Sequence, residues 1–85
     1  MNTVYVLYSK KDDKFYIGFT SDLKRRLVEH KAKKNHTTLR YSDFELIFSE
    51  DFKNKQDALR REKYFKTTKG RKALRLMLKE TLEER

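Results

Sequence analysis

The chain has 85 residues, of which 22 are Lys or Arg and 13 are Asp or Glu, so its formal net charge is +9. This length predicts one domain over residues 1–85, and the absence of cysteine excludes a disulfide scaffold, a thiolate metal site and a cysteine nucleophile. Because no apolar run approaches the ~18 residues of a membrane span and no signal peptide is recognisable, we expect a cytoplasmic protein that does not enter a membrane. The charge favours a polyanionic partner, with nucleic acid ranked before an anionic membrane surface.

Two alternating apolar runs near the start of the chain predict a β-hairpin. The strands are expected over residues 3–9 and 14–19, with a polar four-residue turn between them. In that register opposing residue numbers sum to 23, which places Tyr5 opposite Gly18 and puts Tyr5 and Tyr16 on one face. Because Gly18 has no side chain, we expect room beside Tyr5 for a ligand or for backbone. The alternative is that the two tyrosines are simply half-buried strand residues.

The remaining elements are, in chain order, a helix after Asp22 to about 33, a loop over 34–43, a strand over 44–52, a helix to about 68 and a last helix through 82. Asn54 is the expected N-cap of the second helix, and Gly70 is the expected break before the last helix. Alternation predicts that Phe44, Leu46 and Phe48 share one face of the third strand. The order β-β-α-β-α-α predicts an α/β protein of the α+β type, a small three-stranded antiparallel sheet covered by about three helices.

Two polar side chains interrupt the inward stripe of the first helix. Leu23, Arg26, Leu27 and His30 fall at i, i+3, i+4 and i+7 and therefore share one face, whereas Arg25 points to the opposite side. The functional interpretation is that Arg26 and His30 face a site. The alternatives are that Arg26 extends to solvent from the edge of the stripe and that His30 is a satisfied core histidine.

A carboxylate also interrupts the inward stripe of the second helix. Glu62 lies four residues after Ala58 and three before Phe65, which belong to that stripe. A carboxylate in this position must be paired, bound to a metal or placed at the rim of a cleft. An ion pair with one of the many nearby cations is the alternative to a functional role.

Together these groups have the chemistry that phosphodiester cleavage requires. A carboxylate can hold a divalent metal, and the metal and an arginine can stabilise the charge of a pentacovalent phosphate. A phenol or an imidazole can manage the proton of the attacking water. A non-catalytic nucleic-acid-binding module is a second hypothesis, and a structural or protein-interaction domain is a third that explains neither the charge nor the polar stripe.

The motifs T-V-Y at residues 3–5 and Y-I-G at residues 16–18 resemble the paired signature of the GIY-YIG nuclease superfamily. The similarity continues through residues 16–30, YIGFTSDLKRRLVEH, and through residues 58–63, ALRREK. This similarity covers nearly the whole chain. The sequence closely resembles the small stand-alone bacterial members of the superfamily. The first motif departs from the pattern, because Thr-Val replaces Gly-Ile before the tyrosine. The family fold, a three-stranded antiparallel sheet flanked by helices, agrees with the pattern analysis.

The resemblance implies a role for each polar residue. Tyr5 and Tyr16 match the motif tyrosines, Arg26 the catalytic arginine, His30 the helix histidine and Glu62 the metal-binding glutamate. It implies an endonuclease that hydrolyses DNA with Mg²⁺ or Mn²⁺ and that is structure-selective in DNA repair or recombination. RNA as a substrate, and which tyrosine is the general base, stay open. The alternative is a non-catalytic nucleic-acid-binding module of the same fold.

The positive charge is expected to follow the phosphates of the bound nucleic acid. The candidate residues lie at the end of the first helix, in the loop and in the later helices: Lys33, Lys34, His36, Arg40, Lys63, Lys66, Lys69 and Arg71.

Overall fold

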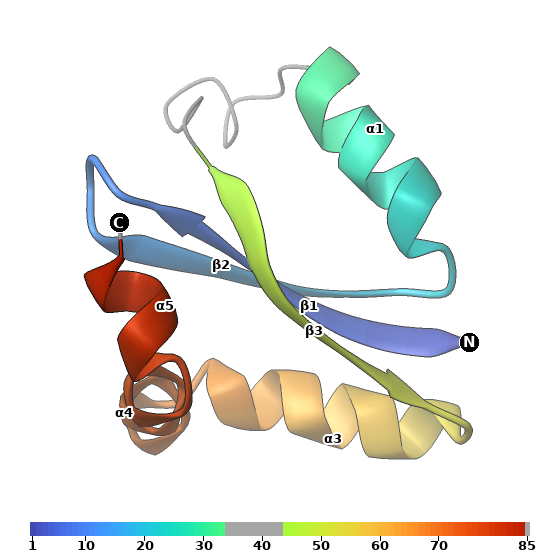
Figure 1. The fold of residues 1–85 in the computed structure, drawn as a ribbon. Helices are drawn as coiled ribbons and strands as arrows, with labels where there is room; N and C mark the ends of the chain where they lie inside the picture. Colours follow the sequence, from blue (N-terminus) through green and yellow to red (C-terminus); the bar gives the residue numbers. More distant parts are fainter. Residues whose placement is uncertain (34–43, 85) are drawn as a thin grey trace.

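The computed structural model describes residues 1–33 and 44–84, so the expected loop at 34–43 lies outside the described residues. A three-stranded antiparallel sheet carries helices on both faces (Figure 1). Its elements are β1 (Asn2–Ser9), β2 (Lys14–Thr20), α1 (Leu23–Lys33), β3 (Glu45–Phe52), α3 (Lys55–Phe65), α4 (Thr68–Met77) and α5 (Lys79–Glu83). The strand order is β2-β1-β3, so that β1 is central and β2 is an edge strand. The α+β class and the antiparallel sheet are confirmed. Within residues 1–33 and 44–84 no helix is long and apolar enough to cross a membrane.

The register of the β-hairpin is the predicted one. Tyr5 lies opposite Gly18 and Leu7 lies opposite Tyr16, as a sum of 23 requires. Asp13 closes the turn with a φ of 53°, in the left-handed region that Asp tolerates better than most residues. Because side chains alternate along each strand, this register places Tyr5 and Tyr16 on the same face of the sheet.

The third strand differs from its prediction. A bulge lies between the partners of Val6 and Leu7, so that Val6 pairs with Phe48 and Leu7 pairs with Leu46. Ile47 is the extra residue, and it packs against the core together with Phe48. The prediction that Leu46 and Phe48 share a face is therefore wrong, because a bulge shifts the alternation by one residue. Leu46 is 37% exposed.

The main hydrophobic core lies on one face of the sheet, which we call the core face. α3 and α4 cover this face, and α1 lies on the opposite side (Figure 1). The buried members of the core are Val4, Val6, Ile17, Ala58, Phe65 and Leu74. Burying large apolar side chains contributes roughly 1.5–3 kcal/mol each, so this face supplies most of the stability of the fold.

Gly70 is not the break between two helices. Thr67 caps α4, its Oγ1 accepting a hydrogen bond of 3.0 Å from the Gly70 amide, so Gly70 lies inside the first turn of the helix. A Cβ at Gly70 would overlap the carbonyl group of Tyr64 at the end of α3. Glycine is therefore required by the close crossing of α3 and α4. The expected last helix is also divided, because α4 ends at Met77 and α5 begins at Lys79.

Side-chain caps set the starts of the helices on both faces. Asn54 caps α3 as predicted, with its Oδ1 accepting from the Gln56 amide at 2.8 Å. Asp22 precedes α1, and its Oδ1 accepts from the Arg25 amide at 3.1 Å. Thr20 holds Asp22 in turn, since its Oγ1 accepts from the Asp22 amide at 3.0 Å. These contacts fix where α1 leaves β2 and hence where its side chains meet the sheet.

Candidate active site

The face of the sheet opposite the core face, which we call the phenol face, carries both motif tyrosines. The Tyr5 hydroxyl lies 3.3 Å from Nε2 of His30, which α1 supplies. The Tyr16 ring meets the same imidazole edge to face, with centroids 5.2 Å apart, and lies 6.4 Å from the Tyr5 ring. The structure therefore brings Tyr5, Tyr16 and His30 into one cluster, on which the Phe44 ring also packs at 6.2 Å from Tyr16.

Tyr5 is buried, at 1% exposure, and its own ring fills the space above Gly18. A Cβ at Gly18 would overlap the phenol oxygen, so the room expected there for a ligand is taken by the tyrosine itself. Burial raises the pKa of Tyr5 to about 12, with a further increase from Tyr16 and an opposing effect of Arg26. At neutral pH Tyr5 is therefore a neutral phenol.

His30 is half-buried and is also neutral at pH 7. Burial is the main cause that lowers its pKa, the charge of Arg26 lowers it further, and Glu29 opposes both. The contact with Tyr5 therefore joins a neutral phenol to a neutral imidazole. The second ring nitrogen, Nδ1, is buried without a hydrogen-bond partner among the described residues.

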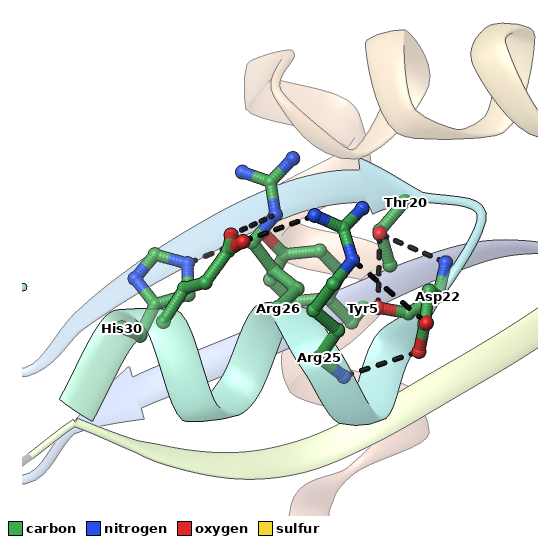
Figure 2. Close-up of polar contacts among 7 residues, drawn as sticks. Tyr5, Thr20, Asp22, Arg25, Arg26 and His30 are labelled. Carbon is green, nitrogen blue, oxygen red and sulfur yellow. Dashed lines mark hydrogen bonds and ion pairs between the residues drawn. The ribbon is translucent and has the colours of Figure 1, made fainter. Parts of the chain in front are cut away.

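Arg25 and Arg26 differ as their helical phase predicts (Figure 2). The side chain of Arg25 is 59% exposed and donates to Glu29 at 3.0 Å, whereas that of Arg26 is 38% exposed. Nε of Arg26 is buried, and the described residues offer it no hydrogen-bond partner, Glu29 Oε1 being 3.7 Å away. Arg26 thus combines a buried donor with an end that reaches solvent, which places it at the edge of the inward stripe.

Glu29 is a residue of this cluster that the sequence analysis missed. It forms ion pairs with both arginines of α1, and its charge acts on the pKa of Tyr5 and of His30. The signal was present in the spacing, because Glu29 follows Arg25 by four residues and Arg26 by three, the separations at which helical side chains meet.

Glu62 comes from α3 and forms the ion pair that was the alternative to a functional role. Its side chain is 20% exposed and accepts a hydrogen bond from Lys66 Nζ at 3.0 Å. Its negative charge nevertheless contributes to the raised pKa of Tyr5, so its field reaches the phenol cluster.

The donor set around Glu62 bears on how a metal would bind. Residues 1–33 and 44–84 hold no group of three His, Asp or Glu side chains suited to a metal ion. Mg²⁺ is commonly held by one or two carboxylates, with water and substrate phosphates completing its octahedron. A single half-buried carboxylate therefore fits such an ion when a phosphate is also present, provided that Lys66 is displaced.

The structure describes some of the candidate phosphate-binding cations. Lys34, His36 and Arg40 lie outside the described residues, as does the side chain of Lys33. Those that are described are exposed on α3, at its C-cap and on α4: Lys63, Lys66, Lys69 and Arg71. Lys66 is engaged with Glu62, and Arg71 lines a separate cavity at the β-hairpin. The structure thus gathers the tyrosines, Arg26 and His30 at one place and leaves these cations on the helices of the core face.

The chain is similar in sequence to a known domain family and to proteins of other organisms. Residues 1–75 match the family model of the GIY-YIG catalytic domain. A UPF0213 protein of Limosilactobacillus reuteri is 40% identical over 79 residues, covering 88% of this chain and 80% of that protein. The UPF0213 protein YazA of Bacillus subtilis is 35% identical over 86 residues, covering 98% and 86%.

A solved structure is also similar. The solution NMR structure of the UPF0213 protein BH0048 from Bacillus halodurans superposes with a TM-score of 0.57 at 28% identity, covering 89% of this chain and 83% of that one. GIY-YIG domains are typical of endonucleases, which act on nucleic acid and generally use divalent metals. The chain belongs to the GIY-YIG family and, within it, to the UPF0213 proteins.

Proposed function

We propose that this protein is a metal-dependent endonuclease that hydrolyses phosphodiester bonds in DNA. The observation that carries the proposal is the contact of Tyr5 with His30 beside the buried Nε of Arg26. In the part of the chain that the structure describes, Arg26 Nε and His30 Nδ1 are the buried side-chain atoms without a hydrogen-bond partner. Unsatisfied buried polar atoms are uncommon and call for a specific reason. The buried Nε belongs to an arginine whose other end reaches solvent, where a phosphate can accept hydrogen bonds from it.

In the proposed mechanism Arg26 binds the scissile phosphate and stabilises the charge that develops on it. Loss of one preorganised donor of this kind typically lowers turnover by about 10²–10³-fold. Two observations support this role: the side chain of Arg26 is 38% exposed, and its ion pair with Glu29 is long, at 3.7 Å. Glu62 would hold the divalent cation, Mg²⁺ or Mn²⁺, and the bound ion would supply further positive charge near the phosphate.

Tyr5 and His30 handle the proton of the attacking water. Because Tyr5 keeps its proton to about pH 12, it is a weak base when it acts alone. His30 removes that obstacle, because the phenol proton can pass to Nε2 over 3.3 Å as the water proton passes to the phenol oxygen. The water oxygen bonds to phosphorus, the bond from phosphorus to the leaving oxygen breaks, and the leaving oxygen takes up a proton from solvent. Tyr16 packs on the imidazole and holds the ring in place. This order makes Tyr5 the proton relay and Tyr16 the positioning residue.

The proposal also names the nucleic-acid substrate and the cellular location. The net charge of +9 supports binding through phosphates, which favours structure-selective cleavage in DNA repair or recombination over recognition of a base sequence. RNA is the alternative substrate, and the cytoplasm, where bacterial DNA lies, is the proposed location. The Glu62–Lys66 ion pair favours a second candidate, a nucleic-acid-binding module without turnover.

The experiment compares Arg26→Ala with its neighbour Arg25→Ala on branched, flapped and nicked DNA, in Mg²⁺ and in Mn²⁺. We expect Arg26→Ala to lower turnover on the order of 10²-fold and Arg25→Ala to leave it nearly unchanged. Equal effects of the two variants would contradict the assignment of Arg26.

A second variant separates the enzyme from the binding module. Glu62→Gln keeps the volume of the side chain and removes its charge, so we expect cleavage to be lost while DNA binding persists. Cleavage by Glu62→Gln at the wild-type rate would exclude Glu62 as a metal ligand. DNA binding by the wild type without turnover of any of these substrates would establish the binding module instead.

A further inference from the structure

A cavity of about 300 Å³ lies between the β1–β2 turn and α4, away from the phenol cluster. We call it the turn cavity, and its lining residues are Asp13, Lys14, Phe15, Arg71 and Arg75. Three of the five are cations and one is a carboxylate, so the lining carries a net charge of +2. Figure 1 shows the β1–β2 turn beside the end of the sheet where α4 and α5 lie.

Arg75 is held in place before any ligand arrives. Its guanidinium stacks over the Phe15 ring at 5.0 Å from the centroid, and its Nη2 lies 3.3 Å from Asp13 Oδ1. Asp13 is itself fixed, because the Tyr8 hydroxyl donates to it at 2.6 Å. The same hydrogen bond is the main cause that lowers the pKa of Asp13, so the carboxylate stays charged. Arg75 therefore offers its remaining donors from a preorganised position.

Arg71 lies one turn before Arg75 on the same face of α4, and it is exposed. Within residues 1–33 and 44–84 its side chain has no hydrogen-bond or ion-pair partner. Two like charges at i and i+4 destabilise a helix by a few tenths of a kcal/mol, and the ion pair with Asp13 involves Arg75 alone. A bound anion would relieve this repulsion, and arginine side chains match the geometry of phosphate oxygens.

The position of the turn cavity relates it to the phenol cluster. β2 is an edge strand, and Lys14 begins it two residues before Tyr16. Two residues of a strand advance by about 7 Å, a distance that a polynucleotide strand spans within a few nucleotides. Alternation along β2 puts Lys14 on the same face of the sheet as Tyr16, which is the phenol face, and Lys14 also lines the turn cavity. A polynucleotide that passes around the edge of β2 therefore meets both the turn cavity and the phenol cluster.

We propose that the turn cavity binds a phosphate group of the nucleic-acid strand that enters the phenol cluster, at a nucleotide other than the one cleaved. The inference rests on the proposed function for the identity of that strand. The phosphate is either an internal phosphodiester or a terminal phosphate monoester. Arg71 and Arg75 bind it.

The test measures DNA affinity rather than cleavage, with the full chain in EDTA so that no turnover occurs. Arg71→Gln is compared with Arg60→Gln, which removes the same charge from an exposed arginine of α3 paired with Asp57. Single-stranded DNA with and without a 5′-phosphate is titrated at several salt concentrations. Each phosphate contact contributes about 0.7 to the slope of log affinity against log salt on single strands.

We expect Arg71→Gln to lower that slope by about 0.7 and Arg60→Gln to leave it unchanged. If the slope falls equally for the oligonucleotides with and without the 5′-phosphate, the bound group is an internal phosphodiester. If it falls only for the phosphorylated oligonucleotide, the bound group is a terminal phosphate. Equal slopes for Arg71→Gln and Arg60→Gln overturn the proposal, as does a wild-type protein that binds no DNA. A lowered slope in a protein that cleaves nothing would leave this site standing while the proposed enzyme fails.

Discussion

Neighbouring residues of β1 are equally buried but touch different things on the two faces of the sheet. Val4 and Val6 are fully buried on the core face, within a cluster that includes Phe65 of α3. Tyr5, at 1% exposure between them, faces the other way and meets His30 through its hydroxyl. Burial therefore does not distinguish a residue of the core from a candidate residue of the site. The difference lies in what the buried side chain contacts, which is an apolar cluster on the core face and a polar side chain of α1 on the phenol face.

The helices on the two faces differ in the same way. α3 and α4 contribute residues with no exposed surface to the core, Phe65 and Leu74 among them. None of residues 23–30 of α1 is buried to that degree. α1 meets the sheet through aromatic and polar contacts, and such elements open at lower free energy than a packed core. We therefore expect the core face to determine stability and the phenol face to determine chemistry.

The two glycines provide the largest test of this comparison. A Cβ at Gly70 would overlap backbone of α3, which cannot move without separating α3 from α4. We expect Gly70→Ala to lower the free energy of unfolding by about 5 kcal/mol or to prevent folding. A Cβ at Gly18 would meet the end of the Tyr5 side chain, so Gly18→Ala should cost about 1–3 kcal/mol. Urea unfolding of both variants measures the difference, and equal losses would show that the phenol face is part of the core.

A pair of apolar truncations tests the helices. Phe65 is fully buried against Phe48, with ring centroids 6.2 Å apart, so Phe65→Ala should lower the free energy of unfolding by about 3–5 kcal/mol. Leu27 of α1 is half-buried, and Leu27→Ala should cost about 1 kcal/mol. Chemical denaturation of the two variants gives both values. A loss at Leu27 as large as that at Phe65 would mean that α1 is as firmly packed as α3.

The pKa of Tyr5 predicts a loss of stability at alkaline pH. An unfolded tyrosine ionises near pH 10, whereas folded Tyr5 keeps its proton to about pH 12. Below pH 10 the group favours the folded state fully. Between pH 10 and 12 only the unfolded state loses the proton, so the free energy of unfolding falls, by about 2–3 kcal/mol. Urea unfolding across this range should show that Tyr5→Phe removes the fall and that the control, Tyr64→Phe on the exposed side of α3, retains it.

Local pattern alone was sufficient for the hairpin and for most of the cluster. The alternation of β1 and β2 and the length of their turn determine the register, so the shared face of Tyr5 and Tyr16 followed from residue numbers. Helical phase likewise separated Arg26 from Arg25. These features depend on short-range geometry, which repeats every two or 3.6 residues. The family resemblance extended them to roles for His30 and Glu62.

Only the tertiary structure shows the features that form where two elements pack against each other. The bulge at Ile47 arises where β3 pairs with β1 and interrupts an alternation that residues 44–52 otherwise display. Gly70 has the sequence signature of a helix break, but the close crossing of α4 over Tyr64 gives it a packing role inside the helix. The turn cavity combines Phe15 with Arg71, residues of distant segments. Each of these depends on how close two distant segments approach, and a spacing rule within one segment contains no such distance.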